Sequence, residues 1–148
     1  MEHSLTTKDF TYFRAIIEEQ IPFHRLLGVK VRFLGEGVCT LYVPFREELV
    51  GDSMRSTLHG GVLSTLIVTC GGFAVWSMCN FNDKISTIDM RVDYLRPAFD
   101  SDLVAESRVR FVGNRVGNAH TVVYPDGAPD NILAEGRSVY NIKRESPR

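Results

Sequence analysis

The feature that most constrains this chain is the stretch from Leu58 to Asn80, LHGGVLSTLIVTCGGFAVWSMCN, which contains no Asp, Glu, Lys or Arg. A helix on a protein surface shows a polar face. This stretch therefore predicts a helix that is buried on all sides and begins at His59-Gly60-Gly61. About 20 apolar residues can also cross a bilayer, but Gly71-Gly72 and the hydroxyl side chains inside the stretch make a membrane span the weaker interpretation.

The composition fits one globular domain over residues 1–148, with 44% hydrophobic and 24% charged residues. A formal charge of −1 offers no general attraction for nucleic acid or for an anionic membrane. Cys39, Cys70 and Cys79 are an odd number of cysteines without metal-ligand spacing, so no metal site is expected. No cofactor is expected either. The N-terminus lacks the layout of a signal peptide, so we expect a cytoplasmic protein.

The chain before this stretch predicts one helix and one hairpin. Thr6 to Ile21 has apolar residues at helical spacing, with Thr6 or Thr7 as N-cap and Pro22 as the end of the helix. His24 follows in a linker and is interpreted as a surface or packed histidine without a catalytic role. Val29–Leu34 and Val38–Val43 predict two strands joined by a short glycine turn. Phe45 to Thr57 shows no clear pattern and predicts a long loop or a short helix.

The chain after this stretch predicts four more strands, at Ile85–Leu95, Leu103–Val112, Val116–Tyr124 and Ile132–Ile142. In the first of them strict alternation would place Thr87, Asp89, Arg91 and Asp93 on one face and Ile88, Met90, Val92 and Tyr94 on the other. Six strands with hairpin-scale connections indicate an antiparallel sheet. The economical architecture is an α+β fold in which this sheet curls around the buried helix.

Three segments carry a family resemblance: LHGGVLSTL at 58–66, STIDMRVDYLRPA at 86–98 and FVGNRVGNAHTVVY at 111–124. Together they resemble hotdog-fold acyl-CoA thioesterases of the phenylacetate-degradation (PaaI-like) type in the 4-hydroxybenzoyl-CoA thioesterase superfamily, in particular the bacterial medium- and long-chain subgroup. The resemblance covers roughly residues 21–140. It implies hydrolysis of an acyl-CoA to a free acid and coenzyme A by a homodimer, often paired into a homotetramer, with active sites between protomers.

The same resemblance assigns roles near the helix start. Gly60 would donate its backbone N–H to the thioester carbonyl as part of an oxyanion hole, and Gly61 would let the substrate approach the backbone. His59 would position this turn, although direct proton transfer remains an alternative. Asp52 and Ser53 stand where the family has an amide that orients the thioester or water, but Asp52 could equally be a solvated loop carboxylate.

One position departs from the family. Nine residues after His59 the family carries a catalytic Asp or Glu, and this chain has Val68, which cannot accept a proton or attack a carbonyl. The resemblance therefore implies weak activity, or a hotdog protein that binds an acyl-CoA or another apolar ligand without efficient turnover. A hotdog dehydratase or hydratase ranks lower. Asp89 and Asp93 are the only acids near the motif that would be candidates to replace the carboxylate, and Cys70 is interpreted as core.

The remaining candidates concern the substrate. Thr87 matches a family position that places the attacking water, yet a threonine is also an ordinary strand residue. An apolar tunnel beside the helix would hold the acyl chain, with Phe73, Trp76 and Met78 as possible wall residues and Thr69 as a nearby hydroxyl. Basic or polar side chains at the rim would meet the phosphates of coenzyme A, and the candidates are Arg96, Asn114 and Arg115.

Overall fold

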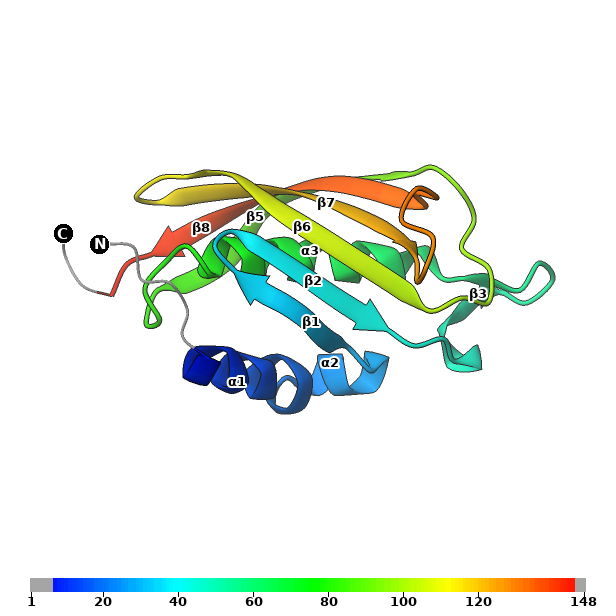
Figure 1. Ribbon diagram of the computed structural model, residues 1–148. Helices are drawn as coiled ribbons and strands as arrows, with labels where there is room; N and C mark the ends of the chain where they lie inside the picture. The colour runs from blue at the N-terminus through cyan, green and yellow to red at the C-terminus, as the bar shows by residue number, and fades with distance from the viewer. Residues whose placement is uncertain (1–6, 146–148) are drawn as a thin grey trace.

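The structure is a computed structural model that describes residues 7–145. Its centre is the long helix α3 (Gly60–Trp76), which lies against one face of a six-stranded antiparallel sheet (Figure 1). The strand order is β1-β2-β6-β7-β8-β5. The strands are β1 (Lys30–Gly35), β2 (Val38–Val43), β5 (Lys84–Tyr94), β6 (Leu103–Val112), β7 (Val116–Pro125) and β8 (Ala134–Lys143). The predicted α+β hotdog arrangement, a curved sheet around one buried helix, is confirmed.

Helix α3 fills the concave side of the sheet because nearly every turn carries apolar side chains. Its buried residues include Leu66, Ile67, Cys70 and Ala74, none of which is exposed to solvent. The inner face of the sheet meets them with other fully buried side chains, among them Leu41, Ala105, Val123 and Ala134. The interpretation of Cys70 as core is confirmed, and burial raises the pKa of its thiol well above the usual value.

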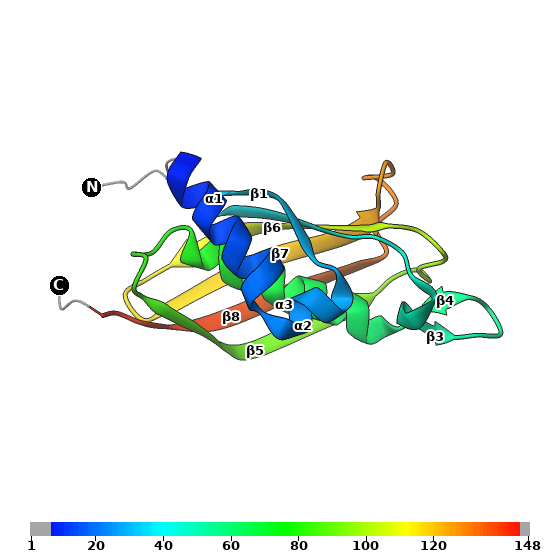
Figure 2. The ribbon, with the colours of Figure 1, turned by 90° about the horizontal axis from the view of Figure 1, so that it is seen from below.

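The N-terminal segment covers the side of α3 that faces away from the sheet (Figure 2). It consists of α1 (Thr7–Ala15), the π-helix η1 (Ile16–Gln20) and α2 (Pro22–Leu27). The predicted end of the first helix before Pro22 is confirmed, since the helical run stops at Gln20, but the interpretation of the next residues as a linker was wrong, because Pro22 opens α2. Proline is favoured at a first helical position, where no N–H is needed. Gly28 (φ 77°) then ends α2. The proposed cap at Thr6 lies outside the described residues.

The segment between β2 and α3 has more structure than the sequence predicted. After the 3₁₀ turn η2 (Glu47–Leu49), strands β3 (Val50–Asp52) and β4 (Thr57–Leu58) form a small two-stranded sheet that projects beyond the main sheet (Figure 2). Gly51 makes this possible, because a Cβ atom there would lie 2.6 Å from the Cα of His59. The hairpin thus holds the start of α3 through close backbone packing.

Strand β5 contains a β-bulge that the predicted alternation missed. Thr87 pairs with Tyr140 and Asp89 pairs with Val139, so Ile88 is an extra residue. An extra residue reverses the faces of all that follow. Thr87 therefore shares the inner face with Ile85, and the predicted grouping of Thr87 with Asp89 and Asp93 was wrong.

Within residues 7–145 none of the helices is long and apolar enough to cross a membrane.

Candidate active site

The start of α3 is built around His59, the N-cap residue. Its Nδ1 atom accepts a hydrogen bond of 2.8 Å from the N–H of Gly61, and its own N–H donates to the carbonyl of Leu49 at 2.8 Å. Because Nδ1 accepts, the ring proton lies on Nε2. Gly61 is required here, since a Cβ atom on it would lie 2.8 Å from Nδ1. The imidazole thus holds the first turn in place.

Gly60 occupies the first helical position, where a backbone N–H has no acceptor inside the helix. Its surroundings form a pocket of about 310 Å³ lined by Arg55, Tyr94 and Arg96 as well as apolar residues. The hydroxyl of Tyr94 donates to the carbonyl oxygen of Gly60 at 3.2 Å. A free N–H at the positive end of a helix dipole, with two guanidinium groups nearby, suits a polar or anionic ligand.

Asp52 and Ser53, predicted as orienting residues, lie in the β3–β4 hairpin. Both oxygens of Asp52 are engaged by its own loop: Oδ1 accepts from the N–H of Met54 at 3.0 Å, and Oδ2 from Nε of Arg55 at 2.8 Å. Hydrogen bonding to Arg55 lowers the pKa of Asp52 below its usual value. Ser53 is exposed in the turn. The Asp52 carboxylate therefore fixes the loop that carries Arg55.

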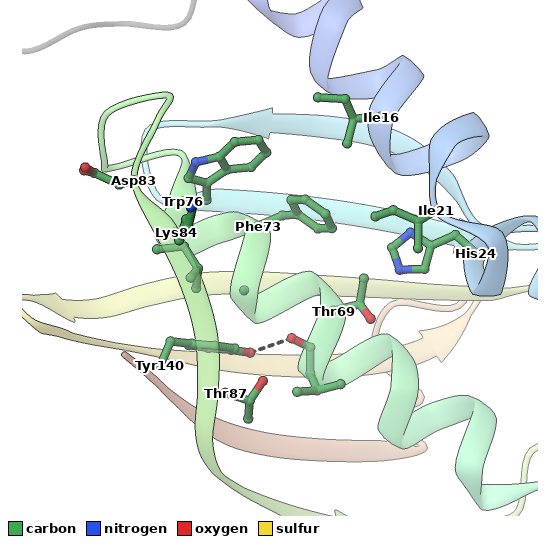
Figure 3. A pocket seen from close by; sticks show the side chains of 13 residues that line it. Ile16, Ile21, His24, Thr69, Phe73, Trp76, Asp83, Lys84, Thr87 and Tyr140 are labelled. Atoms are coloured by element: carbon green, nitrogen blue, oxygen red, sulfur yellow. Dashed lines mark hydrogen bonds between the residues drawn. The ribbon is translucent and has the colours of Figure 1, made fainter. Parts of the chain in front are cut away.

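A second, larger cavity of about 470 Å³ lies beside the middle of α3, between the N-terminal helices and strand β5 (Figure 3). Its walls are mostly apolar. The lining residues are Ile16, Ile21, His24, Val68, Thr69, Gly72, Phe73, Trp76, Asp83, Lys84, Ile85, Thr87 and Tyr140. An apolar cavity of this size with a few polar groups is typical of a site for a small organic ligand.

Five of the residues selected from the sequence meet in this cavity: Val68, Thr69, Phe73, Trp76 and Thr87. The side chain of Val68 packs against the cluster that contains Tyr140, and its carbonyl oxygen accepts a hydrogen bond of 2.6 Å from the Tyr140 hydroxyl. The bulge in β5 brings Thr87 to this side of the sheet. The α3 wall of the cavity therefore presents a hydroxyl and apolar groups, but no carboxylate.

Two of the three predicted wall residues line the cavity. Phe73 and Trp76 line the cavity and pack against each other at 5.8 Å between ring centroids. The indole N–H of Trp76 is buried and has no acceptor among the described residues. Met78 lies elsewhere, next to the position that a Cβ atom on Gly37 would take, and its assignment to the wall was wrong.

Several residues that sequence reasoning did not select also line this cavity, among them His24 and Asp83. The Nδ1 atom of His24 lies 2.9 Å from the carbonyl oxygen of Ile17, and burial lowers the pKa of the ring. Asp83 is buried in an ion pair of 2.9 Å with Arg144. A histidine two residues after a helix-opening proline carries no recognisable pattern, so only the packing of α2 over α3 shows its position.

The remaining candidates do not join either pocket in one chain. Asn114 and Arg115 lie in the β6–β7 turn, at the end of the sheet opposite to the start of α3 (Figure 1). The alternation after the bulge places Asp89 and Asp93 on the outer face of β5, away from the cavity. Gly60 and Val68 themselves are about 12 Å apart along the helix axis. One chain therefore presents two partial sites.

Comparison with known proteins agrees with this architecture. The family model described as "Thioesterase superfamily" matches residues 56–128. This range includes the start of α3 and the β5 residues that line the two pockets. The Halobacterium salinarum protein VNG_1336C is 37% identical over 142 residues, which cover 88% of this chain and 93% of that protein. YigI of Escherichia coli K12, a medium/long-chain acyl-CoA thioesterase, is 32% identical over 117 residues, covering 70% of this chain and 76% of YigI.

Solved structures give the same result. A crystal structure of a thioesterase-superfamily protein superposes with a TM-score of 0.80 at 36% identity, covering 89% of this chain and 97% of the other. A Shewanella oneidensis protein related to the thioesterase superfamily has a TM-score of 0.80 at 25% identity, with 90% and 95% covered. With the fold, the helix start and these relatives in agreement, the chain belongs to the thioesterase superfamily.

Proposed function

We propose that this chain hydrolyses acyl-coenzyme A thioesters to a free acid and coenzyme A. The observation that carries the proposal is the start of α3, where the N–H of Gly60 is free of helical partners and lies in a pocket with Arg55 and Arg96. Such an N–H can stabilise the oxyanion that forms when water attacks a thioester carbonyl. The two arginines suit the phosphates of coenzyme A.

The complete site is proposed to form between two copies of the chain. Strand β5 is an edge strand whose far ends touch the two pockets: Thr87 lines the apolar cavity and Tyr94 lines the Gly60 pocket. Antiparallel pairing of two β5 strands about a two-fold axis near Met90 would place Tyr94 of one copy opposite Thr87 of the other. Gly60 of one copy would then face the cavity beside Val68 of its partner, and the turn at Asn114 and Arg115 would approach the same site.

The substrate is proposed to be an acyl-CoA with a medium or long chain. The walls of the 470 Å³ cavity are apolar over most of their area, with Ile21, Phe73 and Ile85 among them. An alkyl chain gains free energy by leaving water for such walls. The activity in the name of the E. coli relative YigI agrees with this substrate class.

Val68 sets the expected rate. Its side chain offers no proton acceptor to a water molecule beside it, and losing a general base commonly lowers a rate by about 10²–10⁴-fold. We therefore expect slow hydrolysis. The same residue favours a second candidate function, a protein that binds an acyl-CoA in the cavity without efficient turnover.

The test compares the natural chain with Val68→Asp and Val68→Asn on a panel of acyl-CoAs of increasing chain length and one aryl-CoA, following release of free thiol. We expect slow hydrolysis by the natural chain, below about 1 s⁻¹, and at least a 10-fold higher kcat for the Asp variant only. Efficient turnover by the natural chain with no gain from Asp contradicts our interpretation of position 68.

A binding measurement separates the two candidate functions. Both predict that coenzyme A raises the melting temperature, because a ligand that binds only the folded state stabilises it. Stabilisation without thiol release from any substrate supports the binding protein. The absence of both overturns the two functions together.

A further inference from the structure

The apolar cavity contains several polar side chains, and most of them are poorly suited to take a proton from water. Asp83 is buried: its Oδ2 accepts from Arg144 and from the N–H of Asn80, both at 2.9 Å, and its Oδ1 accepts from the N–H of Glu145 at 3.2 Å. Burial tends to raise its pKa, but these hydrogen bonds outweigh burial and the pKa is lowered. Lys84 is paired with Glu145 at 3.3 Å. Asp83 is thus a weak base whose oxygens already accept other hydrogen bonds, and the Lys84 amine is engaged by a carboxylate.

The hydroxyls of the cavity are not bases either. Tyr140 donates its proton to the carbonyl of Val68 at 2.6 Å, and burial raises its pKa. Thr69 and Thr87 carry aliphatic hydroxyls that stay protonated in water and can only orient a neighbouring molecule. Among the described residues that line the cavity, His24 is the remaining group with a basic nitrogen.

The tautomer of His24 is fixed by the N-terminal helices. In a π-helix each carbonyl faces the N–H five residues later, and for Ile17 that residue is Pro22, which has no N–H. The Nδ1 atom of His24 lies 2.9 Å from this carbonyl oxygen. A carbonyl only accepts, so Nδ1 must carry the proton and Nε2 must carry a lone pair.

The lone pair lies on the cavity side of the ring. Figure 3 shows the imidazole between Ile21 and Thr69, on the side of the cavity opposite the sheet. Its ring centroid is 6.2 Å from that of Phe73, one turn after Thr69 on α3. The side chain is 6% exposed, and no partner for Nε2 is found within residues 7–145. The basic nitrogen thus lies beside Thr69 and Phe73 of α3, in the cavity that Val68 also lines.

We propose that Nε2 of His24 is the general base that supports the slow hydrolysis expected of this thioesterase, since α3 carries no carboxylate; the proposal rests on the proposed function. Nε2 takes a proton from water as the water oxygen bonds to the thioester carbonyl carbon, and the carbonyl electron pair moves onto oxygen, facing the N–H of Gly60. This Gly60 belongs to the second copy of the proposed dimer, and the carbon–sulfur bond breaks when the intermediate collapses. The imidazolium returns its proton to the leaving thiolate, so the products are a free acid and coenzyme A.

The charge on the ring agrees with this role. Burial lowers the pKa of His24 below 6.5, although its hydrogen bond to Ile17 opposes part of the shift. The ring is therefore neutral near pH 7. Glu18 on η1 is engaged by the N–H of Val31 at 2.8 Å and by Arg14 at 3.2 Å. The segment of α3 that faces the ring carries no acidic or basic side chain, and across the cavity stand Asp83, Lys84 and Tyr140.

The experiment compares His24→Asn with His24→Ala and with the control His120→Asn. An Asn amide can donate to the carbonyl of Ile17 as Nδ1 does, but it has no basic nitrogen. His120 lies on the outer face of the sheet beside Glu135, 3.6 Å away. We expect His24→Asn to melt close to the natural chain, with kcat about 100-fold lower and KM within a few-fold. His120→Asn should leave the rate unchanged.

The pH profile and chemical rescue separate a base from a structural residue. The hydrolysis rate of the natural chain should fall as the pH is lowered through a pKa below 6.5. This acidic limb of the pH–rate profile should be absent from His24→Asn. Added imidazole should restore part of the rate of His24→Ala. Hydrolysis by His24→Asn within two-fold of the natural chain, with the same acidic limb, overturns the role of His24 and leaves the proposed function intact. No hydrolysis by the natural chain overturns both.

Discussion

The hydroxyl of Tyr140 donates a hydrogen bond of 2.6 Å to the carbonyl oxygen of Val68, through the space where residue 71 would carry a side chain. A Cβ atom on Gly71 would lie 2.5 Å from that hydroxyl oxygen. The bond joins the central helix to strand β8 at the wall of the apolar cavity. The close packing of α3 against β8 therefore requires a glycine at position 71.

Gly71→Ala should destabilise the protein by about 2 kcal/mol, because an inserted methyl group strains a packed core and displaces the Tyr140 hydroxyl. Gly72→Ala is the matched control: its Cβ would lie 3.3 Å from a ring carbon of Tyr140. The helix preference for Ala then offsets the milder contact. Urea unfolding of both variants measures the difference. Tyr140→Phe added to Gly71→Ala should recover stability, and failure to do so would contradict the steric explanation.

His59→Ala should lower the free energy of unfolding by about 1 kcal/mol, the usual cost of losing an N-cap acceptor. His59→Asn should recover most of that loss, since an Asn side chain caps well. Thiol release from acyl-CoA should follow the same order, with the Ala variant slower than the Asn variant. If the Asn and Ala variants hydrolyse acyl-CoA equally slowly while only the Asn variant is stable, the imidazole ring has a chemical role beyond positioning.

The ion pair between Asp83 and Arg144 should give the stability a dependence on acid pH. The folded pKa of Asp83 lies below 3.8, so its contribution is complete above that value and is lost as the pH falls through the lower, folded pKa. Asp83→Asn should cost about 3 kcal/mol at pH 7, as expected when one member of a buried pair is removed. Thermal unfolding between pH 2 and pH 7 is the measurement. Asp126→Asn, which breaks the exposed pair with Arg32 at 2.8 Å, is the control and should change little.

Ile88→Asp should prevent the proposed pairing of two β5 edge strands. Ile88 is 57% exposed on this edge, beside the half-exposed Met90 and Tyr94. Burial of a carboxylate between two copies is unfavourable. Light scattering should show a dimer for the natural chain and a monomer for the variant, with a large loss of hydrolysis.

Phe33→Asp supplies the control for that experiment. Phe33 is 50% exposed on β1, the strand at the other edge of the sheet. This variant should keep the assembly of the natural chain. A monomeric natural chain with full activity would contradict a site shared between copies.

Much of the fold follows from the sequence because its signals are local. The uncharged stretch from 58 to 80 predicts the buried helix, and turn residues separate alternating strands whose limits agree with the structure to within two residues. The start of α3 was also accessible, since Gly60 and Gly61 follow a histidine in a recognisable motif. The small β3–β4 sheet was missed, because two- and three-residue strands have no period to detect.

The cavity was harder to predict for a different reason. Its lining combines α2, α3, β5 and β8, and only tertiary packing decides which of their side chains meet. His24 lies on a six-residue helix and shows no pattern of its own. Thr87 changes face because of an extra residue that alternation cannot reveal from one sequence.

That extra residue, Ile88, divides β5 into two segments that are each in register with β8. Removing it would join Thr87 directly to Asp89 and leave every other side chain of the strand on its present face. Removing a residue elsewhere in β5 would move the side chains of part of the strand to the opposite face of the sheet. The bulge is thus a position where the length of this strand can change during evolution without exchanging its buried and exposed residues.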